Sequence, residues 1–193
     1  RSRGLGDVYK RQSLHSALQP LTGAGVTHLA IEASSHGLAQ HRLDGLNIHI
    51  AAFTNLSRDH LDHHEDMDSY FAAKSRLFTN LLLAGGSAVI NIDDEYGAKL
   101  AASMRVADPR QHVVITVGQD KSADFRIANI SPMDFGLEIT VEHKGQAYQI
   151  PVALAGAFQA VNAVTAAVMA YASGLPIHDS LSALPYVLSL IHI

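Results

Sequence analysis

The sequence predicts an α/β fold in which a mostly parallel sheet is flanked by helices and extended by a small antiparallel β annex. Two observations support this prediction. In the first part of the chain, short apolar and β-branched runs alternate with segments of helical spacing, which is the pattern of βαβ units. After Gly118 three β-like runs follow one another directly, with turn residues between them. We therefore expect a single globular domain.

The elements of the parallel part follow from the spacing of apolar residues. Buried strands are expected at residues 26–31, 48–53, 87–92 and 112–117. Residues 14–21 form a short amphipathic segment, and helices are expected at residues 67–83 and 94–104. We expect the helix at 67–83 to end at Gly85 and Gly86, since glycine often terminates helices. Asp93-Asp94-Glu95 supplies the negative charge that favours a helix start after the third strand.

The antiparallel annex is predicted from residues 123–130, 137–143 and 146–154, with turns at Gly136 and Lys144-Gly145. An Ala-rich helix at residues 158–172 follows the annex and ends at Ser173-Gly174. No internal repeat, low-complexity segment or linker indicates a second domain.

Both ends of the chain look like translated adapter DNA. Residues 7–12 can be encoded by GATGTGTATAAGAGACAG, and the reverse complement of that string encodes residues 188–193. Two unrelated protein termini have no physical reason to be related in this way. We therefore expect residues 1–12 and 188–193 to be non-native tails, and residues 13–187 to be a protein segment cut from a longer chain.

Composition narrows the class of protein. The 193 residues are 48% hydrophobic and 17% charged, which is typical of a globular domain with a sizeable core. The net charge of −4 and the scattered Lys and Arg offer no basic surface, so we expect no nucleic-acid partner. No apolar run reaches the roughly 18 residues of a membrane span. The absence of Cys excludes disulfides and thiolate metal sites and fits a cytoplasmic protein.

Three polar side chains follow apolar runs, where an open α/β sheet collects its ligand groups. Glu32 ends the first expected strand and could hold Mg²⁺ against phosphates, or serve as a helix cap or in an ion pair. His60 could bind metal or phosphate, or be a polar loop residue. Lys74 lies on an apolar helix face, where a charged amine costs free energy unless it is paired, modified or reaches the surface. A neutral Lys74 amine could capture CO₂ and become a carbamate.

Two further patterns could carry chemistry. Ser34-Ser35-His36-Gly37 offers hydroxyls and N–H groups to an anion, or forms a plain turn. A cluster of imidazoles and carboxylates could instead make a zinc or two-metal hydrolase site. Its members are His60, His63 and His64 with Asp59 and Asp62.

Taken in order, three motifs resemble those of the Mur ligases of peptidoglycan synthesis. They are Glu-x-Ser-Ser-His-Gly-Leu-x-Gln-His-Arg (32–42), Phe-Thr-Asn-Leu-Ser-Arg-Asp-His-Leu-Asp (53–62) and Ala-Ala-Lys (72–74). The similarity is dense over residues 26–94 and returns at 156–162 and at 183–187. Residues 156–162 resemble the start of the helix that lies beside the adenine in the family. Motifs of this length and spacing are far more specific than a short Gly-rich pattern. Within the family they resemble enzymes that add the third amino acid to UDP-N-acetylmuramoyl-L-alanyl-D-glutamate.

The resemblance implies a set of site residues and ligands. Glu32, His60 and a carbamylated Lys74 would hold Mg²⁺ and act in catalysis. Ser34, Gln40 and Arg42 would bind the UDP-muramoyl dipeptide, while Asn162 and Asn55 would contact ATP. Gln159 stands where the family often has Asn, and both are amides.

The implied activity is that of an ATP-dependent amide ligase working as a cytoplasmic monomer within the fold of the family's central ATPase domain, which is of P-loop type. ATP would phosphorylate the D-glutamyl γ-carboxylate, and the amine of a diamino acid, meso-diaminopimelate rather than lysine, would attack the acyl phosphate. The sequence lacks the family's Gly-x-Gly-Lys-Thr phosphate loop, its uridine-binding domain and its amino-acid-binding domain. We therefore expect the isolated chain to be inactive.

Three alternatives stay open. A related ligase such as a folylpolyglutamate synthase would share the fold, although the Ser-Ser-His-Gly-Leu segment argues against it. The metallohydrolase built on His60, His63 and His64 would require bound Zn²⁺. The isolated chain could also be a non-catalytic binding module.

Overall fold

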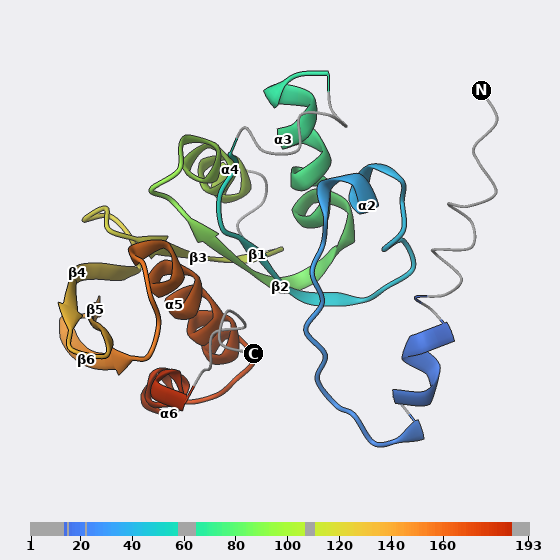
Figure 1. Cartoon of the computed structure of the whole chain (residues 1–193). Coiled ribbons are helices and arrows are strands. Elements are labelled where there is room, and N and C mark those ends of the chain that lie inside the picture. Colours follow the sequence, from blue (N-terminus) through green and yellow to red (C-terminus); the bar gives the residue numbers. More distant parts are fainter. Residues whose placement is uncertain (1–13, 15, 22, 58–64, 107–110, 187–193) are drawn as a thin grey trace. The chain divides into compact units, whose positions relative to one another are not determined.

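The computed structural model describes residues 14, 16–21, 23–57, 65–106 and 111–186 (Figure 1). The chain forms two compact units. The first takes its residues from 1–47 and 58–81, and the second from 48–57 and 82–193. The sheet and the helices that cover it belong to the second unit.

The sheet of the second unit has six strands whose spatial order is their order along the chain. They are β1 (Ile48–Phe53), β2 (Leu82–Asn91), β3 (Val113–Gly118), β4 (Phe125–Met133), β5 (Gly136–His143) and β6 (Gln146–Val152). β1 to β4 pair in parallel, and β4, β5 and β6 pair antiparallel. The predicted mostly parallel sheet with an antiparallel annex is confirmed, and the annex forms one edge of the same sheet.

Helices cover both faces of this sheet (Figure 1). They are α4 (Glu95–Val106), α5 (Ala157–Ala172), the short α6 (Ile177–Ser182) and the 3₁₀ turn η3 (Leu184–Tyr186). Val89 joins Val164 and Val168 of α5 in one buried cluster. Its neighbours Ala88 and Ile90 are also fully buried but point to the other face, because side chains alternate along a strand. α4 contacts β2 and β3 on that other face. Burial on both faces explains why the parallel strands read as continuous apolar runs.

The core of the second unit lies between the sheet and α5. Val117, Phe125, Ile139 and Val141 are completely shielded from solvent there. The ring of Phe125 stacks on His143 with ring centroids 3.8 Å apart and meets the edge of Tyr171 at 5.4 Å. This packing joins the start of the antiparallel annex to α5.

The strand predicted at residues 26–31 is wrong. These residues form no regular structure, and the side chains of Val26, Leu29 and Ile31 are 43%, 52% and 40% exposed. A strand needs a neighbouring strand to accept and donate its backbone hydrogen bonds. No strand in the described part of the chain pairs with residues 26–31. The apolar composition of this run was therefore not sufficient to make it a strand.

The helix predicted at residues 67–83 begins as expected but ends earlier. α3 (Met67–Arg76) is followed by the π-helical turn η2 (Leu77–Leu81), and β2 already begins at Leu82. Gly85 and Gly86 therefore do not terminate the helix but lie inside β2, next to a register shift opposite Ile48 and Ile50. Gly85 has φ +76°, and a Cβ on Gly86 would lie 2.8 Å from the His49 carbonyl oxygen. In a strand, glycine marks such irregularities and close backbone approaches.

The remaining predicted elements are confirmed with shifts of a few residues at their ends. The predicted helix at 94–104 is α4, and the predicted helix at 158–172 is α5. The amphipathic segment at 14–21 is helical at residues 14 and 16–21.

The first unit contains α2 (Ser35–Ala39) and α3, which contact each other. A capping box starts α3, since Asp66 accepts the Ser69 N–H at 2.7 Å and Ser69 Oγ accepts the Asp66 N–H at 3.2 Å. The hydrogen bond from the Ser69 backbone lowers the pKa of Asp66.

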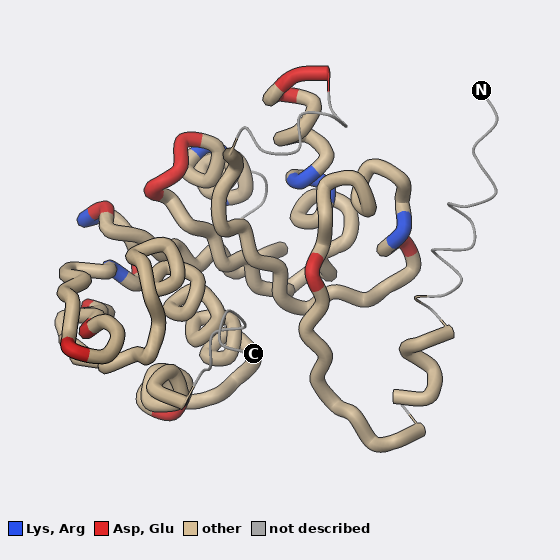
Figure 2. Tube along the Cα trace, in the orientation of Figure 1, with Lys and Arg blue, Asp and Glu red and all other residues tan. Residues whose placement is uncertain are grey.

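Charges are dispersed over the described residues. Figure 2 shows Lys and Arg as short separate stretches on several elements. Within the same residues, no helix combines the length and the apolar character that a membrane crossing requires.

Candidate functional site

The three residues predicted to bind the UDP-muramoyl dipeptide flank the short helix α2. Ser34 precedes the helix, and Gln40 and Arg42 follow it. Ser34 is the N-cap, and its Oγ accepts the Gly37 N–H at 3.1 Å. Gln40 is the C-cap, and its Oε1 accepts a hydrogen bond from the Arg42 guanidinium. A Cβ on Gly37 would lie 3.0 Å from Ser34 Oγ and 3.8 Å from Arg42 Cδ. Glycine at this position therefore lets the serine and arginine side chains come close to the helix.

The turn that follows α2 is held by several polar contacts. His41 has φ +59°, a left-handed conformation that is uncommon for residues other than glycine. Its Nδ1 lies 2.8 Å from Asp44 Oδ2, and the Arg42 N–H donates to the Gly37 carbonyl at 2.9 Å. Gln40 and Arg42 are thus presented from an ordered backbone.

The pKa of Asp44, the acidic residue of this turn, is shifted by its neighbours. The hydrogen bonds from Arg76 lower its pKa most, and the contact with His41 lowers it further. Burial opposes these effects, and the net result is a lowering of the Asp44 pKa from 3.8 to about 2. The carboxylate therefore stays charged at any pH near neutral.

Lys74 lies on α3, in the same unit as α2. Its side chain is half-buried, and Nζ is 5.4 Å from the centroid of the Tyr70 ring, one helical turn earlier. Tyr70 is itself 3% exposed. An amine over the face of a buried aromatic ring is partly shielded from water and is attracted by the ring. The local surroundings fit both a cation and a modified amine.

Of the three predicted metal ligands, Glu32 and Lys74 lie among the described residues. The sequence predicted Glu32 at the end of a strand, and this placement is wrong. Glu32 lies exposed in the irregular segment that leads to Ser34. His60 lies outside the described residues, together with Asp59, Asp62, His63 and His64 of the alternative hydrolase site. Among the residues that are described, no three His, Asp or Glu side chains gather as a metal site. A carboxylate and a carbamate would both supply the oxygen ligands that Mg²⁺ prefers, so the donor chemistry of Glu32 and Lys74 fits this ion.

The two residues predicted to contact ATP belong to the second unit. Asn55 is exposed in the loop after β1, and this loop is anchored where Asp94 Oδ2 accepts the Leu56 N–H at 3.2 Å. Asp94 also accepts the N–H groups of Tyr96 and Gly97 at the start of α4. One carboxylate thus joins the carboxyl end of β1 to the helix that follows β2, as expected at the ligand-binding edge of an open α/β sheet.

Asn162 is exposed on the first turns of α5, and the structure adds a neighbour that the sequence analysis missed. Phe158 lies four residues earlier on the same helix face and is 64% exposed. Gly156, with φ +90°, precedes the helix, and a Cβ there would lie 2.9 Å from Phe158 Cε1. An exposed aromatic ring beside an amide can stack on and hydrogen-bond to a planar base. The only signal in the sequence was a large apolar residue at a helix start.

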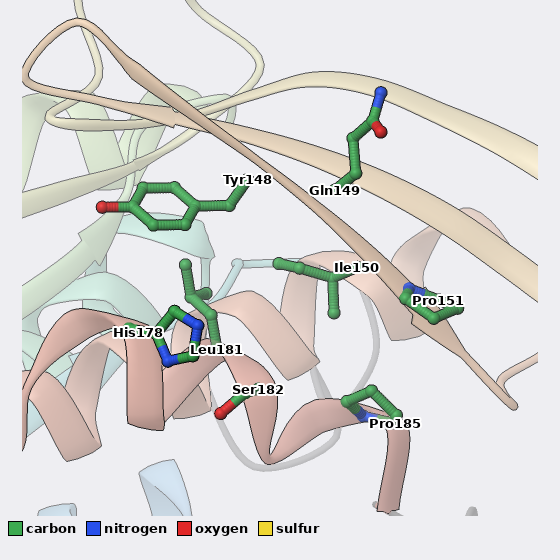
Figure 3. A pocket seen from close by; sticks show the side chains of 8 residues that line it. All are labelled: Tyr148, Gln149, Ile150, Pro151, His178, Leu181, Ser182 and Pro185. Carbon is green, nitrogen blue, oxygen red and sulfur yellow. The ribbon is translucent and has the colours of Figure 1, made fainter.

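A surface pocket of about 270 Å³ lies in the second unit, between β6 and α6 (Figure 3). Figure 3 shows Tyr148 and Ile150 of the strand facing His178 and Leu181 of the helix. The full lining is Tyr148, Gln149, Ile150, Pro151, His178, Leu181, Ser182 and Pro185. None of the predicted site residues belongs to it, so we do not assign the predicted chemistry to this pocket.

Comparison with known proteins shows which family the chain resembles. A family model described as Mur ligase middle domain matches residues 8–170. The chain is 41% identical over 162 residues to a protein of Bradyrhizobium diazoefficiens named UDP-N-acetylmuramoyl-L-alanyl-D-glutamate--2,6-diaminopimelate ligase. It is 44% identical over 173 residues to a protein of the same name from Rhizobium meliloti. These alignments cover 84% and 89% of this chain but only 33% and 35% of the relatives. The chain therefore spans about a third of the length of the curated relatives that it matches.

Solved structures give the same result. A structure described as UDP-N-acetylmuramoyl-L-alanyl-D-glutamate--2,6-diaminopimelate ligase superimposes with a TM-score of 0.83 at 32% identity, covering 92% of this chain and 36% of that one. A MurF structure from Acinetobacter baumannii gives a TM-score of 0.63 at 19% identity and covers 73% of this chain and 29% of that one, which shows likeness of fold alone. A folylpolyglutamate synthase mutant of L. casei, with a TM-score of 0.55 at 17% identity, covers 74% of this chain and 35% of that one and likewise shows fold alone.

Proposed function

Because this chain belongs to the Mur ligase family, whose middle domain it matches, we propose that it forms the middle domain of an ATP-dependent ligase of peptidoglycan synthesis. The substrate would be UDP-N-acetylmuramoyl-L-alanyl-D-glutamate, and the added amino acid would be meso-diaminopimelate. Both substrates appear in the names of the relatives at 41% and 44% identity. The enzyme would act in the cytoplasm as a monomer, with ATP and Mg²⁺ as cofactors.

The observation that carries this proposal is the cluster of Ser34, Gln40 and Arg42 around α2. Arg42 presents a guanidinium whose direction is fixed by Gln40 Oε1, and a guanidinium fork matches the two oxygens of a carboxylate. The cluster is thus suited to hold an acidic acceptor in one orientation. Orientation of this kind supplies a large share of the barrier reduction in two-substrate reactions.

Lys74 would contribute as a carbamate. The nitrogen of its neutral amine attacks the carbon of CO₂ and releases one proton to solvent, which converts the neutral amine into an anion with two oxygen ligands. Lys74 is half-buried on α3, which contacts α2 of the same unit, so the carbamate would lie on the helix that packs against the acceptor-binding segment. Mg²⁺ held by this carbamate, Glu32 and His60 would neutralise charge on the transferring phosphoryl group.

At the nucleotide end, Asn162 would hydrogen-bond the adenine edge and Phe158 would lie against its face. Asn55 would contact the nucleotide from the loop after β1. The sequence contains no Gly-x-Gly-Lys-Thr loop for the phosphates, so we propose that the 193-residue chain alone binds ATP weakly and is inactive. Tight ATP binding to this chain in calorimetry would contradict that part of the proposal.

The test of the function uses the full-length protein that carries this chain. Purified protein is given the UDP-muramoyl dipeptide, ATP and either meso-diaminopimelate or L-lysine, and ligated product is measured by mass spectrometry. Lys74→Ala should lower the ligation rate at least about 100-fold, because loss of a metal ligand costs more than loss of a residue that orients one. A short carboxylic acid such as acetate should restore part of the rate by replacing the carbamate oxygens.

Lys99→Ala is the matched control, since Lys99 is an exposed lysine on α4. It should leave ligation unchanged. Undiminished Mg²⁺-dependent ligation by Lys74→Ala would contradict the proposal that Lys74 acts as a carbamate. If the wild-type protein ligates neither meso-diaminopimelate nor L-lysine, the proposed function is contradicted.

A further inference from the structure

Arg76 of α3 contacts α2 and the turn that follows α2. Its Nη1 and Nη2 donate to Asp44 Oδ1 and Oδ2 at 2.8 and 2.9 Å, which makes a bidentate ion pair. Nη1 also donates to the carbonyl oxygen of Leu38 at 3.1 Å. Leu38 lies in α2, and Asp44 lies in the turn after it, so one guanidinium contacts both parts of the segment that carries Gln40 and Arg42.

The segment is short and needs such support. α2 has five residues, fewer than an isolated helix needs to be stable. The following turn contains the left-handed residue His41, whose ring also contacts Asp44. The carboxylate of Asp44 is therefore shared between a contact inside the turn and a contact to α3. Loss of either His41 or Arg76 as a partner of Asp44 would remove a contact that holds His41 in its left-handed backbone conformation.

We propose that Arg76 and Asp44 are positioning residues, which fix the acceptor-binding side chains of Gln40 and Arg42 relative to Lys74 on α3. This inference rests on the proposed function. Arg76 lies two positions after Lys74 on the same helix, so its side chain ties the turn to the backbone that carries the amine. Neither Arg76 nor Asp44 touches substrate in this scheme; both act through the residues that do.

The geometry favours a positioning role over a generic surface ion pair. The side chains of Arg76 and Asp44 are 20% and 30% exposed, and both guanidinium Nη atoms are used. The Arg126–Glu142 pair across β4 and β5 is more exposed, at 31% and 44%, and has a single contact of 2.9 Å. Planar, bidentate pairs give orientation that a lysine ammonium cannot reproduce. Displacements of about 1 Å in such positions can cost on the order of 100-fold in rate.

The experiment measures steady-state kinetics of the full-length protein carrying Arg76→Met, Arg76→Lys or Asp44→Asn. We expect the KM for the UDP-muramoyl dipeptide to rise about tenfold or more in Arg76→Met and Asp44→Asn, because the acceptor site is then poorly ordered. The KM for ATP should stay within about twofold, since the adenine contacts lie in the other unit. Arg76→Lys should fall between wild type and Arg76→Met, because it keeps the charge and loses the fork.

The double variant Arg76→Met with Asp44→Asn should raise the dipeptide KM by less than the product of the two single effects, since both single variants remove the same ion pair. Arg126→Met is the control and should change neither KM. A purely structural role of Arg76 would lower the melting temperature and the active fraction while the remaining enzyme kept a wild-type KM for the dipeptide, and this result would overturn the inference.

If Arg76→Met does not fold, Arg76→Lys and Asp44→Asn carry the same test. An unchanged dipeptide KM in both, in an active enzyme, overturns the positioning role and leaves the proposed function standing. A wild-type enzyme without ligation overturns the proposed function itself, and the inference falls with it.

Discussion

The two units of this protein differ in the interactions that stabilise each of them internally. In the second unit, the largest buried side chains, among them Val89, Phe125 and Ile139, form one apolar cluster between the sheet and α5. In the first unit, apolar side chains such as Leu38 and Phe78 are also buried, but the segment around α2 depends in addition on polar contacts, above all Arg76 to Asp44. Apolar burial is non-directional, whereas hydrogen bonds and bidentate ion pairs fix orientation. The comparison indicates that apolar burial stabilises both units, and that the directional contacts of the first unit fix the turn that carries Gln40 and Arg42.

The largest expected effect is a core truncation in the second unit. Phe125→Ala removes a completely buried ring that packs on His143 and Tyr171. It should lower the free energy of unfolding by about 3–5 kcal/mol, as measured by urea unfolding followed by far-UV circular dichroism. Phe135→Ala is the control, because Phe135 is 93% exposed, and it should change that free energy by less than about 0.5 kcal/mol. Similar losses in both variants would show that the cluster under α5 is not the stabilising core.

A smaller effect is expected from acid in the first unit. The Asp44 pKa is lowered from 3.8 to about 2 when the protein folds, chiefly by Arg76. The folded state therefore binds this proton more weakly than the unfolded state, and the ion pair stabilises fully above pH about 4. This contribution of about 1–2 kcal/mol, discounted for partial exposure, should be lost as the pH falls from about 4 to about 2.

Hydrogen exchange at residues 35–45, measured between pH 5 and pH 2 and corrected for intrinsic rates, checks this expectation. Protection should fall with pH in the wild type and should depend much less on pH in Asp44→Asn. If both proteins lose protection in parallel, another group controls the acid sensitivity of this turn.

The smallest expected effect comes from the cap of α2. Ser34→Ala removes the acceptor of the Gly37 N–H and should destabilise the helix by about 1 kcal/mol. The exchange rate of the Gly37 amide, followed by NMR, should then rise about fivefold. Ser103→Ala on the exposed face of α4 should leave that rate unchanged. Equal Gly37 exchange in wild type and Ser34→Ala would mean that tertiary contacts alone hold α2.

Much of the second unit could be predicted from local patterns. The apolar runs of β1 and β3 and the helical spacing of α4 and α5 each gave the correct element, because burial on one or two faces leaves a period in the sequence. The boundary between α3 and β2 could not be predicted in this way. Gly85 and Gly86 are equally suited to a helix end and to an irregular strand, and the pairing of Leu82 with Ile48 decided between them.

The candidate site was predictable as a set of residues but not as an arrangement. Ser34, Gln40 and Arg42 are close in sequence, and the structure brings them together around α2. Their role as substrate contacts stays a prediction, as does the metal site of Glu32, His60 and Lys74. Asp44 and Arg76 are 32 residues apart, and no local pattern indicates that an Arg and an Asp at this separation will pair.

By itself, the sequence determined the order and type of most elements and the family motifs, since these depend on the spacing of neighbouring residues. Tertiary structure alone decided that residues 26–31 are not a strand, that β2 begins at Leu82, and that Arg76 holds the turn after α2. Each of these outcomes depends on a hydrogen-bonding partner far away in the chain. Such partners leave no period in the sequence, because any residue with the right donor or acceptor can supply them once folding has brought it near.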